Sequence, residues 1–324
     1  MVFFIIVLRA LSACLITNAH YTGIYPTDLI ANGGLIGDVL FFAISGYCLF
    51  NCKTNFPRWY GKRLYRIYPP VIFITLFYFL TGSYTFGKNN FVWWFIYPTY
   101  YHFVASILFL YIPYYLVVKW KFLRDRIPLI MLSILLIYFL VYVLFYDKSY
   151  YHIDNVREWM IRFLFFESML LGAYFRKNKE KFENKFHWSL PIITVLMFGL
   201  YFASKMIFVK YSKYASLQIL NQLLIFGLLF FLFYLFASLD ARLQRMPKVV
   251  KKVLIFLSDI TLEIYVVQYV IIALIRPYLT FPLNWIAITA SIILAAFILH
   301  VVCELFYKLV AFLGNKIGKN YNIK

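Results

Sequence analysis

Residues 127–146 read IPLIMLSILLIYFLVYVLFY, a run of 20 residues without a charged side chain. An α-helix needs about 20 consecutive apolar residues to cross the hydrocarbon layer of a bilayer, so this run predicts a membrane-spanning helix. The whole chain is also strongly apolar: 64% of its 324 residues are hydrophobic, only 14% are charged, and the mean hydropathy is +0.77. A soluble domain is nearer half apolar and one quarter charged. The composition therefore predicts an integral membrane protein.

Nine further stretches on either side of this run have a similar length and character. We predict an all-α, polytopic membrane bundle of about ten transmembrane helices, at residues 2–24, 33–51, 66–82, 101–118, 127–146, 159–176, 188–208, 217–239, 253–275 and 285–312. The aromatic segment 91–101 contains a proline and is too short to span, so we expect it to be interfacial or re-entrant. No connection is long enough for a second folded unit, so residues 1–324 are predicted to form one integral-membrane domain without an appended soluble domain.

The 32 Lys and Arg residues outnumber the 13 Asp and Glu residues, giving a formal charge of +19. Of these cations, 23 fall on the connections of one side, eight fall on the other side, and Arg9 lies inside the first span. Cytoplasmic connections carry the excess of Lys and Arg, so both termini are predicted to be cytoplasmic, in a multi-pass protein of the cell (inner) membrane. Topology accounts for most of the charge, and no nucleic-acid partner is expected.

Ionisable side chains inside the spans are costly and are therefore candidate functional residues. They are Arg9, His20, Asp38, Glu167, Asp259, Glu263, His300 and Glu304. Arg9 and His20 are eleven residues apart, which places them on one helix face, roughly 16 Å apart along the axis. With the N-terminus inside, they would line an internal path that has Arg9 near the cytoplasm and His20 near the opposite surface. In the alternative interpretation, Arg9 reaches cytoplasmic headgroups and His20 is an interfacial residue bonded to backbone.

Two further arginines follow the second span. Arg63 and Arg66 are one helical turn apart and would project the same way at the cytoplasmic mouth, a geometry suited to a multiply anionic group. Pro69 and Pro70 follow at once and are expected to set the entry angle of the third span. The alternative is a positive-inside stop that contacts anionic lipids.

The remaining ionisable residues are expected to make structural contacts. Two i, i+4 pairs on the last two spans are predicted to be buried polar contacts that tie these helices to the bundle, namely Asp259 with Glu263 and His300 with Glu304. Arg162 is the expected partner of Glu167. A His with one Glu offers only two ligands, so no metal site is predicted.

Six blocks recur at matching positions in a known family of ten-span proteins, and they run over nearly the whole chain: LRALSACLITNAH (8–20), GGLIGDVLFFAISGY (33–47), KRLYRIYPP (62–70), YHFVASILFLYIPYY (101–115), FFESMLLGAYF (165–175) and LSDITLEIYVVQ (257–268). Jointly they resemble the acyltransferase-3 family of bacterial integral-membrane acyltransferases, which mostly O-acetylate cell-surface glycans. Three places depart from the family pattern. Ile6 and Val7 stand where an acidic residue is usual, Gln268 stands where a histidine is common, and no proline closely follows Glu304.

The resemblance implies an O-acetyltransferase that uses acetyl-CoA as co-substrate, without a bound cofactor. Its acceptor would be a hydroxyl of exopolysaccharide or of another surface or lipid-linked glycan. The resemblance also implies donor binding by Arg9, Arg63 and Arg66, with His20 as the general base for the attacking hydroxyl. An acyl-histidine intermediate is the less favoured route. Possible support or acceptor contacts would come from Asp38, Glu167, Asp259, Glu263 and Glu304.

Two other functions fit a bundle with buried charges. One is a transporter or flippase of lipid-linked sugars, and the other is a non-catalytic partner in a glycan-synthesis complex. Repeat-built transporters place broken helices in corresponding halves of the chain, whereas the buried charges here concentrate in the first two and last two spans. The acceptor hydroxyl, the size of the acyl group and the oligomeric state stay open.

Overall fold

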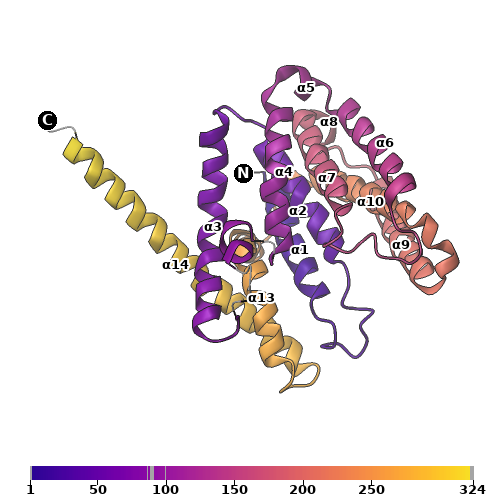
Figure 1. Ribbon diagram of the computed structural model, residues 1–324. Coiled ribbons are helices and arrows are strands. Elements are labelled where there is room, and N and C mark those ends of the chain that lie inside the picture. Colours follow the sequence, from indigo (N-terminus) through magenta and orange to yellow (C-terminus); the bar gives the residue numbers. More distant parts are fainter. Residues whose placement is uncertain (1, 86, 88–90, 99, 322–324) are drawn as a thin grey trace.

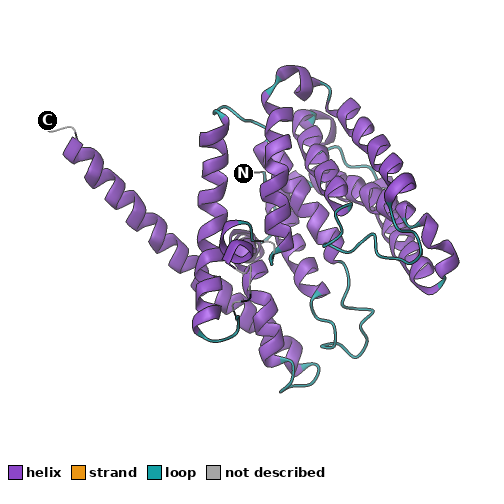
Figure 2. Ribbon diagram, viewed as in Figure 1, coloured by secondary structure: helices purple, strands orange, loops and turns teal. Residues whose placement is uncertain are grey.

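The computed structural model describes residues 2–85, 87, 91–98 and 100–321, and for residues 314–321 it describes the backbone alone. Every regular element in this part of the chain is a helix (Figure 2). In chain order these are α1 (Phe3–Ala19), α2 (Gly34–Leu49), α3 (Phe56–Leu80), η1 (Val92–Ile96), α4 (His102–Lys119), α5 (Lys121–Asp125), α6 (Ile127–Phe145), α7 (Ile161–Lys177), α8 (Lys179–Phe182), α9 (Ser189–Lys210), η2 (Ser212–Leu217), α10 (Ile219–Ser238), α11 (Asp240–Leu243), α12 (Lys248–Asp259), α13 (Thr261–Ile275) and α14 (Leu283–Tyr321). Each of the ten predicted stretches contains a helix, which confirms the all-α prediction.

Fewer than ten of these helices are long and apolar enough to cross a bilayer alone. Within the described residues α4, α6, α9, α10 and α14 meet that test, and α12 with α13 would make a sixth, bent span. The apolar helices α1 and α2 are only 17 and 16 residues long. The count of ten spans and the cytoplasmic termini therefore stay predictions.

The outer faces of the bundle are apolar. Large side chains on α6 and α9, such as Leu136 and Ile192, are exposed, as expected for helices that contact lipid. Figure 1 shows α5 and α8 at one end of the bundle, and the α1–α2 and α13–α14 connections at the opposite end. The carboxyl-terminal part of α14 extends away from the other helices (Figure 1). The aromatic segment predicted to be interfacial forms the short helix η1, whose Trp94 packs against α3.

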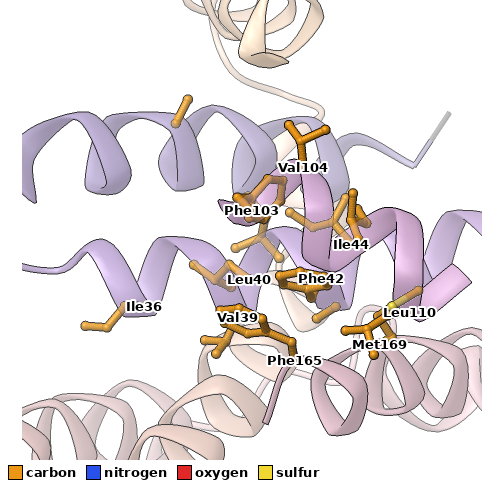
Figure 3. Close-up of a cluster of buried hydrophobic side chains, with 14 of the residues drawn as sticks. Ile36, Val39, Leu40, Phe42, Ile44, Phe103, Val104, Leu110, Phe165 and Met169 are labelled. Atoms are coloured by element: carbon orange, nitrogen blue, oxygen red, sulfur yellow. The ribbon is translucent and has the colours of Figure 1, made fainter. Parts of the chain in front are cut away.

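Helix α2 lies at the centre of the bundle, where small residues allow close packing. A Cβ atom at Gly46 would lie 1.9 Å from the Met169 carbonyl oxygen of α7, and one at Gly172 would lie 1.8 Å from the Ala43 carbonyl oxygen. Close approach through glycine is typical of membrane helix pairs. Aromatic rings fill the space beside these contacts, as Figure 3 shows for Phe42 and Phe165, which stack with centroids 4.3 Å apart.

The amino terminus of α1 is capped by a residue far along the chain. The Phe4 N–H donates a hydrogen bond of 2.7 Å to Oδ1 of the buried Asp240, and the Gln244 side chain donates one of 2.7 Å to Oδ2. The first N–H groups of a helix have no partner within the helix, so this carboxylate satisfies one of them. At the other end of α1, the Asn18 side chain donates to the carbonyl oxygens of Ile30 and Asn32, which holds the α1–α2 connection.

The predicted span 253–275 is broken. Helices α12 and α13 meet at Ile260 with a bend of 71°. The Thr261 hydroxyl donates to the Ser258 carbonyl oxygen at the bend, a local side-chain bond that competes with the helical ladder. Asp259 ends α12 and Glu263 lies in the first turn of α13, so the prediction that they stand one turn apart on a single helix is wrong.

Candidate functional site

A cavity of about 520 Å³ opens between α1, α2, α3, α4, α14 and the bend of α12 and α13. Most of the ionisable residues that the sequence singled out line this cavity. They are Arg9, Arg63, Arg66, Asp259, Glu263, His300 and Glu304. Predicted spans one, three, nine and ten thus contribute side chains to a single site, together with polar and apolar groups of α2 and α4.

The basic wall of the cavity is built by α3 and α1. Arg63 and Arg66 project from the first turns of α3, with Lys62 beside them, and Arg9 faces them from α1. The guanidinium of Arg63 lies 4.9 Å from the ring centroid of Trp59, which restricts its orientation. Four cationic side chains therefore face one space, an arrangement suited to an anion with several charges.

Pro69 and Pro70 were expected to set the entry angle of a span that starts at residue 66. They lie instead inside one continuous helix. Helix α3 starts at Phe56, with Pro57 in its first turn, and continues through Pro69 and Pro70. Proline has no N–H, so Pro70 leaves the carbonyl oxygen of Arg66, four residues earlier, without its helical partner. The Tyr307 hydroxyl of α14 donates to this oxygen at 3.3 Å. The prolines thus join the arginine-bearing turn of α3 to α14.

Acidic residues of α12, α13 and α14 also line the cavity. Nδ1 of His300 lies 3.0 Å from Oε1 of Glu263, which connects α14 to α13. Glu263 is buried and His300 is half-buried, whereas Asp259 and Glu304 are exposed. The sequence analysis grouped the residues along each helix, but the observed pair joins Glu263 of α13 to His300 of α14. Glu263 and His300 thus tie α13 and α14 to each other. The prediction that Asp259 and Glu304 are buried contacts is wrong, because both are exposed.

Asp38 and Glu167 are buried away from the cavity. Each is only 6% exposed, and neither lies in the wall of the cavity as far as the structure describes it. Oε1 of Glu167 has no hydrogen-bond partner, and the described residues show no ion pair between Glu167 and Arg162. The expected partnership with Arg162 is therefore wrong.

His20 is outside the large cavity, at the opposite end of α1. It follows the last helical residue, is exposed, and packs edge-on against Tyr269 of α13 with ring centroids 6.5 Å apart. Helix α1 runs without a break to Ala19 and His20 keeps αR backbone angles, so Arg9 and His20 lie on one side of it, as helix geometry predicted. Between them on this side, Ala13 and Ile16 line a second cavity.

This second cavity is narrow, about 10 Å³, and lies between α1 and α13. Four of its wall residues also belong to the wall of the large cavity, namely Phe41, Phe103, Thr261 and Leu262. Its wall further includes Gln268, the residue before Tyr269. The two cavities therefore adjoin and extend from Arg9 along α1 toward His20.

Some wall residues had no signal in the sequence analysis. Ser258 lines the large cavity and is buried, yet its hydroxyl oxygen has no hydrogen-bond partner. A partner for the Arg66 carbonyl oxygen, which is Tyr307 in the structure, could have been expected from Pro70, because a proline inside a helix leaves the carbonyl oxygen four residues earlier without its helical partner. Among the described residues, no group of three or more His, Cys, Asp or Glu side chains is placed to hold a metal ion.

The fold and the site define a helical membrane protein with a basic cavity that narrows into the bundle. A family model described as an acyltransferase domain matches residues 2–305, nearly the whole chain. The chain therefore belongs to the acyltransferase-3 family and is a membrane acyltransferase, as the resemblance of its sequence blocks predicted. No curated protein and no solved structure matches it significantly.

Proposed function

We propose that the protein transfers an acetyl or similarly small acyl group from acetyl-CoA, entering from the cytoplasm, to a hydroxyl of a cell-surface or lipid-linked glycan. The observation that carries the proposal is the large cavity, in which Arg9, Lys62, Arg63 and Arg66 face one space inside the region that matches the acyltransferase family. Acetyl-CoA combines several phosphate charges with a long neutral arm that ends in the thioester. The cluster of cations suits the charged part of this donor.

The charged side chains that line the cavity support one orientation of the donor. The phosphates would bind Arg63 and Arg66 at the mouth, with Arg9 deeper, while the carboxylates of Asp259 and Glu304 would repel phosphate from the part of the wall that they line. The buried Glu263 is already paired with His300 and so presents less free negative charge. The neutral arm would then extend along α1, past the residues that the two cavities share.

His20 is the proposed general base. Imidazole has an ordinary pKa near 6.5, so a neutral form that accepts a proton is available at physiological pH. The imidazole takes the proton of the acceptor hydroxyl while the hydroxyl oxygen attacks the thioester carbonyl. The C–S bond then breaks, and the departing CoA sulfur receives the proton. The products are an O-acyl glycan and free CoA, so atoms and charge balance.

The exposure of His20 agrees with this role, because the acceptor must reach it from the side of the α1–α2 connection. Entry of the donor at one end of α1 and of the acceptor at the other would let a cytosolic acyl group modify a glycan across the membrane.

The test compares surface glycan from cells that express the native chain, no chain, His20→Ala or His187→Ala. His187 is exposed and far along the chain, before α9, so His187→Ala is the matched control. Mass spectrometry should find one added acetyl group per modified sugar with the native chain and the control, and none with His20→Ala. Glycan that is identical in all four strains contradicts the proposal and favours the transporter or assembly-partner functions.

A further inference from the structure

Two of the buried side-chain atoms that lack a hydrogen-bond partner belong to residues that line the cavities. One is the hydroxyl oxygen of Ser258 in the large cavity, and the other is Oε1 of Gln268 in the narrow cavity. Gln268 is only 1% exposed. Buried polar groups are almost always paired, because removing them from water without a partner destabilises the fold. The unpaired oxygen of Gln268 therefore requires an explanation.

The position of Gln268 supplies one. Residues 261, 264, 265 and 268 of α13 line the narrow cavity opposite α1, so Gln268 lies on the face that looks toward Ala13 and Thr17. The next residue, Tyr269, contacts the ring of His20. Gln268 thus stands between the large cavity and the proposed base. The rest of the surrounding wall is mainly apolar, so few other groups there can pair with a polar ligand.

We propose that Gln268 binds the acyl donor, with Oε1 accepting a hydrogen bond from an amide N–H of the pantetheine arm as the thioester approaches His20. This rests on the proposed function. The pantetheine arm is the neutral part of CoA between its phosphates and its sulfur, and it carries two secondary amides. An apolar passage with one carboxamide oxygen matches an apolar chain with an occasional N–H donor.

The narrow cavity must widen to admit the arm, because about 10 Å³ is room for no more than one water molecule. Phe41, Phe103 and Leu262 separate the two cavities and are the side chains that must move. Phe41 and Leu262 are only partly buried, so they can turn toward the large cavity without losing a fully packed environment. The donor would therefore open its own passage to Gln268.

The proposed hydrogen bond between Gln268 and the pantetheine arm is tested by changing the donor and the protein separately and together, with the purified full chain in lipid nanodiscs. Acetyl-CoA is compared with two analogues in which one or the other pantetheine amide is replaced by an ester, which removes a single N–H donor. The protein is used native, as Gln268→Met, and as Gln222→Met. Gln222 is also 1% exposed, and both of its carboxamide atoms are unpaired, but it lines neither cavity, so it is the matched control.

The native protein and the control should show a KM that one of the two esters raises by roughly 3- to 10-fold, the size of one neutral hydrogen bond. In Gln268→Met the KM for acetyl-CoA should rise by a similar factor, and the same ester should then have no further effect. Because the substitution removes an unpaired buried group, the variant should unfold at a temperature no lower than the native protein.

Equal KM values for both esters and acetyl-CoA in the native protein contradict the inference, whether or not any variant folds. An ester effect that persists unchanged in Gln268→Met also contradicts it. If the native protein neither binds acetyl-CoA nor transfers its acetyl group, the proposed function fails instead. Gln268→Leu repeats the cycle should Gln268→Met be recovered unfolded.

Discussion

Arg9 and His20 stand on one face of α1 but in different surroundings. Arg9 looks into a cavity of about 520 Å³ that also holds Lys62, Arg63 and Arg66. His20 lies at the exposed end of the helix, against the ring of Tyr269 and next to the connection that leads to α2. The amino-terminal half of α1 thus contributes a cation to a basic cavity, and the carboxyl end of α1 offers a proton acceptor where solvent or an acceptor molecule can reach it. The difference indicates that donor binding and proton transfer are separated along the helix.

The largest effect is expected at the His20 end. Replacing His20 by Ala removes the proposed base, and general-base catalysis contributes about 10²- to 10⁴-fold, so transfer at saturating acetyl-CoA should fall by at least about 100-fold. The measurement is transfer of radiolabelled acetyl from acetyl-CoA to glycan by the purified protein. If the transfer rate of His20→Ala were within a few fold of the rate of His187→Ala, His20 would not be the general base.

The next effect belongs to the Arg9 end. Replacing Arg63 and Arg66 together by Ala removes two charged contacts to phosphate, each worth roughly tenfold or more in affinity. The KM for acetyl-CoA should rise by about 100-fold, with a smaller change in kcat. Arg58→Ala is the control, because Arg58 is an exposed cation of α3 outside the cavity wall. Equal KM values for the control and the double variant would show that Arg63 and Arg66 do not bind the donor.

A third substitution should lower the stability of the folded protein by removing the cap at the amino terminus of α1. Asp240→Ala deletes the carboxylate that caps α1 through the Phe4 N–H and should lower the free energy of unfolding by about 1–2 kcal/mol. Thermal unfolding in detergent is the measurement, with Glu180→Ala as an exposed control. The folded fraction should keep its kcat and KM. A selective loss of donor affinity would show that the cap positions Arg9.

The smallest effect concerns the link from α14 to α3. Tyr307→Phe removes the hydroxyl that donates to the Arg66 carbonyl oxygen, and should raise the KM for acetyl-CoA only about 2- to 5-fold. Tyr65→Phe is the control, because its ring packs on Tyr307 with centroids 5.0 Å apart. If both variants match the native protein, the turn that bears Arg66 holds its position without this bond.

The helices were predictable from sequence because a long apolar run is a local property. The positions of Arg9 and His20 on one face followed from helix geometry alone. The start of α3 was missed, although Pro57 after Asn55 is a usual signal for a helix start. The break at Ile260 was missed because no proline or glycine marks it. The Glu263–His300 pair could not be predicted, since it depends on how two helices pack.

Equilibrium binding of acetyl-CoA to His20→Ala in nanodiscs tests the separation of the two ends most directly. The account predicts a Kd within about twofold of the native value in a protein that has lost transfer, because the charged contacts to the donor lie at the Arg9 end of α1. Loss of binding together with loss of transfer would contradict it, since His20 would then belong to the donor site itself.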